Sequence, residues 1–203
     1  LFCFPAGIQQ IGPNGDYANF NDAITSLINA GICGPVVFEV ASGTYNEQVV
    51  IPAISGTDSV NTITFRSSTG NFDDVILTCS PTAQSSYVLK FENSHDIFFE
   101  NISVVSTSTL ANPNATAQGN VLVIENSNNL EFTGNRFVAR RLQKSSNANA
   151  ITMMGIVSDI VISNNVIDSS YIGIMNKVVD ATDNIINIKG CNLKLRSSVL
   201  EAI

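Results

Sequence analysis

The stretch VLKFENSHDIFFENISV (88–104) aligns without a gap with VLVIENSNNLEFTGNRF (121–137) and with ITMMGIVSDIVISNNVI (151–167). The three stretches follow one another at similar intervals and place apolar residues over one another, as in the column that holds Ile97 and Ile160. A repeat of about thirty residues indicates units that cannot bury their apolar face alone and therefore stack. Within each unit, apolar and polar residues alternate over several positions, which predicts strands rather than helices. We therefore expect a parallel β-helix.

The same register continues on both sides of this stretch. We align Ile186 with Ile160 and Ile63 with Val37, each pair in neighbouring coils. We predict a single all-β domain that spans the whole chain, residues 1–203, with about six coils in residues 36–203.

One segment, residues 19–31, has a helical pattern. Asn19 is a good N-cap residue, and Gly31 can end the helix in a left-handed conformation. We expect this helix to cover the open end of the first coil, where exposed strand edges and core would otherwise aggregate. The apolar residues that give the spacing of a one-sided helix are Phe20, Ala23, Ile24, Leu27 and Ile28.

The composition narrows the class of protein. Of the 203 residues 44 % are apolar and only 13 % are charged, and the polar residues are largely Asn, Ser and Thr, as is usual for secreted β-solenoids. The net charge of −7 argues against a nucleic-acid partner. No apolar run is long enough to span a bilayer. We expect a secreted protein or one exposed at the cell surface.

The four cysteines do not form a metal-binding motif. There is no CxxC pair and the only histidine is His95, so we predict no zinc site. Cys3 and Cys33 either form a disulfide that fastens the N-terminus to the helix, as in secreted proteins, or remain buried thiols. The opening LFCFPAG is either the tail of a signal peptide or a strand of the mature chain.

The N-terminal third contains a pattern made of Gly15-Asp16-Tyr17, Phe20, Ala23-Ile24, the strand at 36–40 and Gly43-Thr44-Tyr45-Asn46-Glu47-Gln48. In this pattern it resembles pectin-lyase-like right-handed β-helix proteins, and pectin methylesterases in particular. Together with Gly31–Pro35 it is also similar to β-helix modules of secreted Bacteroidota surface proteins. The resemblance implies a right-handed coil, in keeping with the preferred hand of β crossovers, and assigns Tyr45 and Glu47 to the scaffold.

The resemblance does not extend to the chemistry of those esterases. They use one Asp as general acid/base, a second Asp as nucleophile and an Arg, held in strand motifs of the type G-x-x-D-F-I-F-G. The nearest stretch here, Asp96-Ile97-Phe98-Phe99, lacks the glycines and the partner Asp. Because fold does not imply function, we assign no catalytic residue.

A basic cluster lies in the insert at 139–150. Arg140, Arg141 and Lys144 are three of only ten basic residues in this acidic chain. They would suit a carboxylated or sulfated glycan, which Arg contacts in a bidentate manner. In a lyase such a residue would act as the base beside Ca²⁺-binding Asp residues. The alternative is a solvated loop.

Two pairs of carboxylates are brought close by the repeat or by sequence. Glu92 and Glu125 stack in equivalent turns, and Glu100 and Glu131 lie near each other in the alignment. Such pairs can perform acid/base chemistry or bind Ca²⁺, but solvated turn residues would give the same pattern. We predict no cofactor, since no clear Ca²⁺ site is present.

We expect three polar residues of the repeat to have structural roles. Asn135 and Asn165 occupy equivalent positions, where stacked Asn side chains can hydrogen-bond one another and the backbone at a bend. His95 aligns with turn positions in the next two coils, so we expect an exposed turn residue.

The favoured function is a non-catalytic extracellular module, a scaffold or adhesive segment with polysaccharide as a partner. One alternative is a carbohydrate-active enzyme, either a polysaccharide lyase or an esterase on pectin-like polymers. It would be favoured by two or three carboxylates with an Arg or Lys on one outward face, which the aligned repeats do not show. The other alternative is self-assembly by end-to-end stacking of coils.

Overall fold

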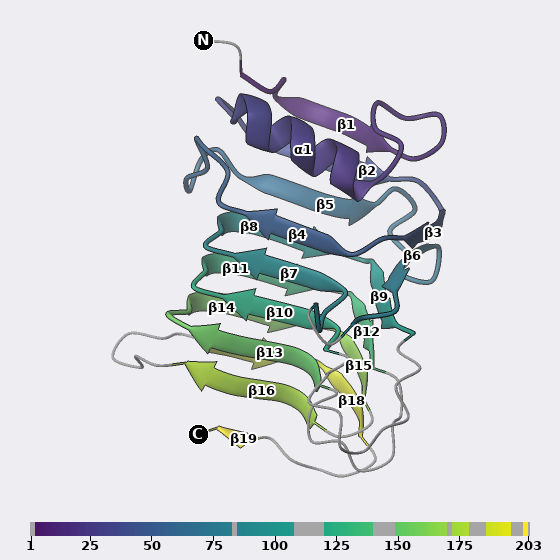
Figure 1. Ribbon diagram of the computed structural model, residues 1–203, viewed down its shortest axis with the longest axis vertical. Coiled ribbons are helices and arrows are strands. Elements are labelled where there is room, and N and C mark those ends of the chain that lie inside the picture. The colour runs from purple at the N-terminus through teal and green to yellow at the C-terminus, as the bar shows by residue number, and fades with distance from the viewer. Residues whose placement is uncertain are drawn as a thin grey trace.

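The computed structural model describes residues 3–82, 85–107, 120–139, 149–169, 172–178, 186–195 and 201–202. The chain winds into a parallel β-solenoid with one short helix, and successive turns stack from the N-terminal to the C-terminal end (Figure 1). Every pairing between neighbouring strands is parallel. The predicted fold class is therefore confirmed.

Three sheets run along the solenoid, and each turn contributes one strand to each sheet. The first sheet contains β1 (Gly7–Ile11), β2 (Val36–Val40), β5 (Ile63–Ser67), β8 (His95–Glu100), β11 (Asn128–Thr133), β14 (Ser158–Ser163) and β17 (Ile186–Lys189). The second contains β3 (Gly43–Asn46), β6 (Val75–Cys79), β9 (Ser103–Ser106), β12 (Arg136–Val138), β15 (Val166–Ser169) and β18 (Asn192–Leu195). The third contains β4 (Val49–Pro52), β7 (Leu89–Glu92), β10 (Leu122–Glu125), β13 (Asn149–Gly155), β16 (Ile172–Val178) and β19 (Glu201–Ala202).

The number of turns is slightly lower than the predicted six. The strands from β2 to β16 make five complete turns, and β17, β18 and the two-residue β19 begin another. The predicted count therefore includes this last, incomplete turn.

The predicted register of the central coils is confirmed. Ile97 pairs with Leu130, and Leu130 with Ile160. Towards the N-terminus one alignment is wrong by one residue, because Ile63 pairs with Val36 and not with Val37. In this Val-Val pair either residue could face the core, and the structure buries Val36 completely while Val37 is half-buried. A slip of one residue exchanges the two faces of a strand.

Aromatic side chains cover the inner face of the first sheet, which faces the core. Phe38 stacks on Phe65 with ring centroids 4.8 Å apart, and Phe65 lies 6.3 Å from Phe99. Phe132 and Ile162 continue this column in the next two turns. Stacking equivalent positions in this way buries apolar area that a single turn would leave exposed.

The N-terminal end is covered by a helix and a strand together. Helix α1 (Phe20–Ala30) begins at Asn19, whose side chain accepts a hydrogen bond from the backbone of Asp22, and ends at Gly31 with φ of 64°. It lies against β4, while β1 extends the first sheet past β2 (Figure 1). The predicted bounds of the helix are correct, but the cover is not made by the helix alone. No helix in the described part of the chain is long and apolar enough to cross a membrane.

The Gly43–Gln48 motif joins this end cover to the coils. Glu47 accepts hydrogen bonds from the backbone N–H groups of Phe20 (2.9 Å) and Asn21 (3.0 Å), where a carboxylate satisfies donors left free by the first turn of a helix. The Tyr45 hydroxyl donates to the Ala41 carbonyl at 2.9 Å. These contacts give Tyr45 and Glu47 a structural role within the scaffold.

Asn side chains support the bends between the first and second sheets. Asn135 Oδ1 accepts from the Ile102 backbone N–H at 3.0 Å, and its Nδ2 donates to the Phe99 carbonyl at 2.7 Å. One turn further, Asn165 Oδ1 accepts from the Asn135 backbone N–H at 2.7 Å. Both side chains are almost fully buried, so they satisfy backbone groups that water does not reach.

The free edge of β1 is partly blocked. The Gln10 backbone N–H donates to Asp16 Oδ2 at 2.8 Å, and the Gln10 carbonyl accepts from the Tyr17 backbone N–H at 3.1 Å. Edge strands covered in this way cannot pair with another chain at the same groups. Stacking through this end would need other contacts, and self-association through coil ends stays a prediction.

Candidate functional site: the outer face of the first sheet

The predicted basic site lies outside the described residues. Arg140, Arg141 and Lys144 fall in the segment 140–148, so the basic insert remains a prediction. Of the cysteines, Cys3 and Cys33 form a disulfide with 5.8 Å between their Cα atoms, whereas Cys79 and Cys191 are free.

The stacked pair Glu92 and Glu125 is bridged by a lysine. Lys90 Nζ lies 2.6 Å from Glu92 and 2.7 Å from Glu125 on the outer side of the third sheet. Burial acts to lower the pKa of Lys90, but its hydrogen bonds to the two carboxylates outweigh this and raise the pKa. Both carboxylates are thus occupied in an ion network. Among the described residues no three His, Cys, Asp or Glu side chains are grouped to hold a metal ion.

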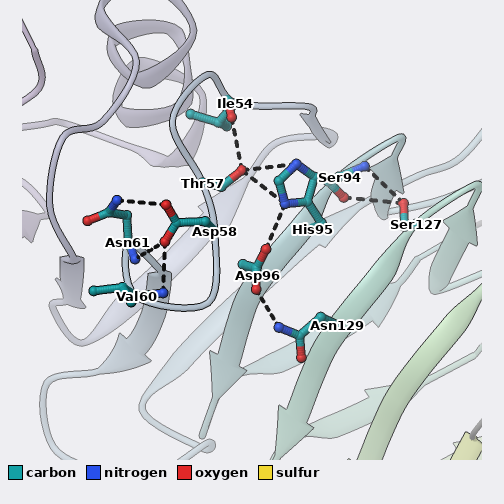
Figure 2. A network of polar contacts seen from close by, with 10 residues as sticks. All are labelled: Ile54, Thr57, Asp58, Val60, Asn61, Ser94, His95, Asp96, Ser127 and Asn129. Atoms are coloured by element: carbon teal, nitrogen blue, oxygen red, sulfur yellow. Dashed lines mark hydrogen bonds and ion pairs between the residues drawn. The ribbon is translucent and has the colours of Figure 1, made fainter.

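His95 belongs to a network that fastens a loop to the first sheet (Figure 2). Its Nδ1 lies 2.7 Å from Asp96 Oδ2, and the other oxygen of Asp96 accepts from Asn129. Thr57, from the loop between β4 and β5, places its Oγ1 3.3 Å from both ring nitrogens. His95 is therefore half-buried and bonded rather than an exposed turn residue, because this loop folds back over the start of β8.

The Thr57, His95 and Asp96 group resembles a nucleophile–base–acid triad but lacks its geometry. In a triad the hydroxyl lies along the lone pair of Nε2, a direction that points away from Nδ1. Here Oγ1 is equally distant from both nitrogens, and it donates to the Ile54 carbonyl at 2.9 Å. Thr57 is also only 8 % exposed. The network fits a structural clamp.

The outer face of the first sheet is formed by two parallel rows of outward side chains, which we call the apolar row and the charged row. Alternate residues of each strand point outward, and the register stacks them from turn to turn. The apolar row is Ile8, Val37, Thr64, Phe98, Glu131, Val161 and Asn187. The charged row is Gln10, Glu39, Arg66, Glu100, Thr133, Ser163 and Lys189.

At the N-terminal end of the charged row, Arg66 is already paired. Its Nη2 lies 2.7 Å from Glu39 Oε1, and Gln10 Nε2 donates to the other carboxylate oxygen at 3.1 Å. The hydrogen bonds from Arg66 and Gln10 lower the pKa of Glu39. Arg66 is therefore ion-paired with Glu39 on this face.

Further along, two carboxylates are not paired with a cation. Within the described residues Glu100 has no side-chain hydrogen bond or ion pair, while Glu131 accepts one hydrogen bond, from the Thr133 hydroxyl at 2.8 Å. Burial raises the pKa of Glu100; the charge of Arg66 acts against this and that of Glu131 adds to it. Two carboxylates of the same face thus interact unfavourably.

Phe98 lies beside both carboxylates. It pairs with Glu131 across the strands and stands two residues before Glu100 on β8, and its ring is half-buried on the outward side. Aromatic rings inside the solenoid are part of the core, whereas the outward ring of Phe98 is accessible for contact with a ligand.

Sequence patterns did not reveal this arrangement. They predicted no group of carboxylates with an Arg on one outward face, and the structure corrects this by bringing Glu39, Arg66, Glu100 and Glu131 together on one face. A signal was present, because Arg66 follows Ile63 by as many positions as Glu39 follows Val36. The alignment of Ile63 with Val37, one residue out of register, hid the pairing.

No protein-family model matches this sequence, and a search of curated proteins finds no match. Solved structures do resemble the fold. The pectin methylesterase from Aspergillus niger matches with a TM-score of 0.55 and 22 % identity over 98 % of this chain and 70 % of its own. A mutant pectin methylesterase in complex with a hexasaccharide matches with a TM-score of 0.53 and 11 % identity over 81 % of this chain and 55 % of its own. The pectin methylesterase PemA from Erwinia chrysanthemi matches with a TM-score of 0.51 and 11 % identity over 81 % of this chain and 54 % of its own.

At these identities the likeness concerns the fold, and the chain spans about half the length of two of these enzymes. The stacked strands of the solenoid and these neighbours agree with the architecture expected from the repeat. The chain therefore has the pectin-lyase-like parallel β-helix fold found in pectin methylesterases.

Proposed function

We propose that this chain is an extracellular β-helix module that binds a glycan on the outer face of its first sheet without converting it. The observation that carries this proposal is the outward ring of Phe98 beside Glu100 and Glu131 on a continuous face of parallel strands. An aromatic ring offers a sugar an apolar platform, and nearby carboxylates accept hydrogen bonds from its hydroxyl groups. A regular stack of turns would let such contacts follow a polymer along the solenoid axis.

Two further observations support an extracellular location and a carbohydrate ligand. The Cys3–Cys33 disulfide suits an oxidising, extracellular environment. The structural neighbours are pectin methylesterases, one of them in complex with a hexasaccharide. Because fold does not imply function, these neighbours support a carbohydrate ligand and do not name it.

The test is a binding screen with acidic, neutral and amino-sugar oligosaccharides, followed by calorimetry on any ligand that raises the melting temperature. We expect Phe98→Ala to weaken binding at least tenfold. The matched control is Ile156→Ala, which removes an exposed apolar side chain in the turn between β13 and β14. The control should bind like the wild type, and both variants should melt close to it. Unchanged affinity in Phe98→Ala would refute the placement of the site.

A second candidate is an enzyme on a glycan. It is favoured by the carboxylates Glu100 and Glu131 that share an outward face with Arg66. The raised pKa of Glu100 adds to this, since a carboxyl kept protonated to higher pH suits proton transfer. Released methanol, unsaturated products and new reducing ends would be measured on the same oligosaccharides with and without Ca²⁺. Turnover that disappears in Glu100→Gln and in Glu131→Gln would replace the non-catalytic function with this one.

The basic insert can be tested in the same screen. If Arg140, Arg141 and Lys144 hold a carboxylated or sulfated glycan, their joint replacement by Ala should abolish binding of acidic oligosaccharides only. Loss of binding to neutral oligosaccharides as well would contradict a charge-based role for this insert.

A further inference from the structure

The outer face of the first sheet has an excess of negative charge around Phe98. Arg66 stands opposite Glu100 on the neighbouring strand, but its guanidinium lies 2.7 Å from Glu39. This leaves Glu100 and Glu131 without a cationic hydrogen-bonding partner in the described part of the chain. A bound molecule must therefore be compatible with two carboxylates beside an aromatic ring.

The charge of the ligand decides how well it fits. A polyuronate would place its own carboxylates next to Glu100 and Glu131, and like charges in close contact are unfavourable. A neutral glycan would donate hydroxyl hydrogen bonds to the two carboxylates but would leave their negative charge unbalanced when it displaces water, which also costs free energy. A ligand with ammonium groups would pair with the carboxylates, and Phe98 would contribute a cation–π contact.

A divalent metal ion fits the same place less well. Ca²⁺ takes six to eight oxygen ligands, and no group of three acidic or other metal-binding side chains exists among the described residues. One aromatic face with two carboxylates matches an ammonium group, which needs few ligands at short range. The net charge of −7 would in addition attract a polycation from a distance.

We propose that the glycan bound by this face carries free amino groups, and so is a cationic amino-sugar polymer. The inference rests on the proposed glycan-binding function and names the chemical class of its ligand. Glu100 and Glu131 are its charge-selecting residues, and Phe98 is its platform. The selection is made by charge complementarity and therefore differs from recognition of an acidic polymer by a basic insert.

The experiment compares three oligosaccharides of equal length by calorimetry at about pH 6 and low salt: oligomers of glucosamine, the same oligomers fully N-acetylated, and oligogalacturonate. We expect the glucosamine oligomers to bind at least tenfold more tightly than the N-acetylated ones and oligogalacturonate not to bind. Glu100→Gln and Glu131→Gln should each weaken binding of the glucosamine oligomers about tenfold, and added salt should weaken their binding to the wild type.

The control variant is Asp159→Asn, which removes the same charge from an exposed position outside the two rows. It should change affinity less than about twofold. Binding should also weaken as the pH falls through the raised pKa of Glu100, because the protonated carboxyl cannot pair with an ammonium group.

The outcomes separate this inference from the proposed function. Equal or tighter binding of the N-acetylated or acidic oligomers, still dependent on Phe98, would overturn the inference and leave glycan binding in place. Equal losses in Asp159→Asn and Glu100→Gln would also overturn it, since the effect would then come from net charge alone. No binding of any oligomer would overturn both.

Discussion

Replacing Asn135 by Ala should destabilise the solenoid strongly although the residue touches no candidate ligand. The change leaves the Ile102 backbone N–H without its partner, and a buried unsatisfied donor costs about 1–3 kcal/mol. The Phe99 carbonyl loses one hydrogen bond, worth about 0.5–1.5 kcal/mol. Because Asn135 is fully buried, water does not replace either contact. The expected loss is therefore about 2–4 kcal/mol, a large share of the stability of an ordinary domain.

The assay is urea unfolding followed by circular dichroism at neutral pH. The matched control is Asn187→Ala, which removes an exposed Asn from β17 and should change the free energy of unfolding by less than about 0.5 kcal/mol. A loss in Asn135→Ala no larger than in this control would refute the reasoning, because the carboxamide would then not be the partner of these backbone groups.

Asn135→Asp gives a second test of the same contacts. The Asp side chain keeps an acceptor for the Ile102 N–H but presents an oxygen instead of a donor to the Phe99 carbonyl. Protonation restores the donor, so the loss of stability in this variant should be smaller at acidic than at neutral pH. A pH-independent loss would show that the donor to Phe99 contributes nothing.

Three further changes test other parts of the structure. Gly134→Ala should lower the free energy of unfolding in urea more than Gly70→Ala does. Both residues have a positive φ, but an added Cβ at Gly134 would clash with the Asn101 carboxamide oxygen, whereas at Gly70 it would meet nothing. Equal losses of stability would contradict this crowding at Gly134. Glu100→Gln should raise the melting temperature at pH 7 but not below the pKa of an unfolded Glu, about 4.3, because burial, the main cause of the raised pKa of Glu100, makes its ionisation unfavourable in the folded state. No gain at pH 7 would contradict an unfavourable ionisation of Glu100 in the folded state. Replacing Cys3 and Cys33 by Ser should lower the free energy of unfolding by about 3–4 kcal/mol, as expected for a loop of this length. It should also abolish the effect of a reductant on the melting temperature, and an undiminished effect would point to another disulfide.

The repeating architecture follows from the sequence alone. Residues of neighbouring coils such as Ile97 and Leu130 pair as the gapless alignment predicts, because strand periodicity and stacking repeat along the chain without reference to distant segments. The helix bounds are equally local, since they depend on a capping side chain at Asn19 and a positive φ at Gly31.

The composition of the outer face depends on packing between turns. Arg66 meets Glu39 because Val36, and not Val37, points into the core, a choice between two adjacent valines that depends on packing against the next turn. Loops follow no period, so the contact of Thr57 with His95 could not be inferred from the repeat either. The alternation of a strand specifies that one set of residues faces outward, but the partner strand selects which set it is, and a one-residue difference exchanges core for surface.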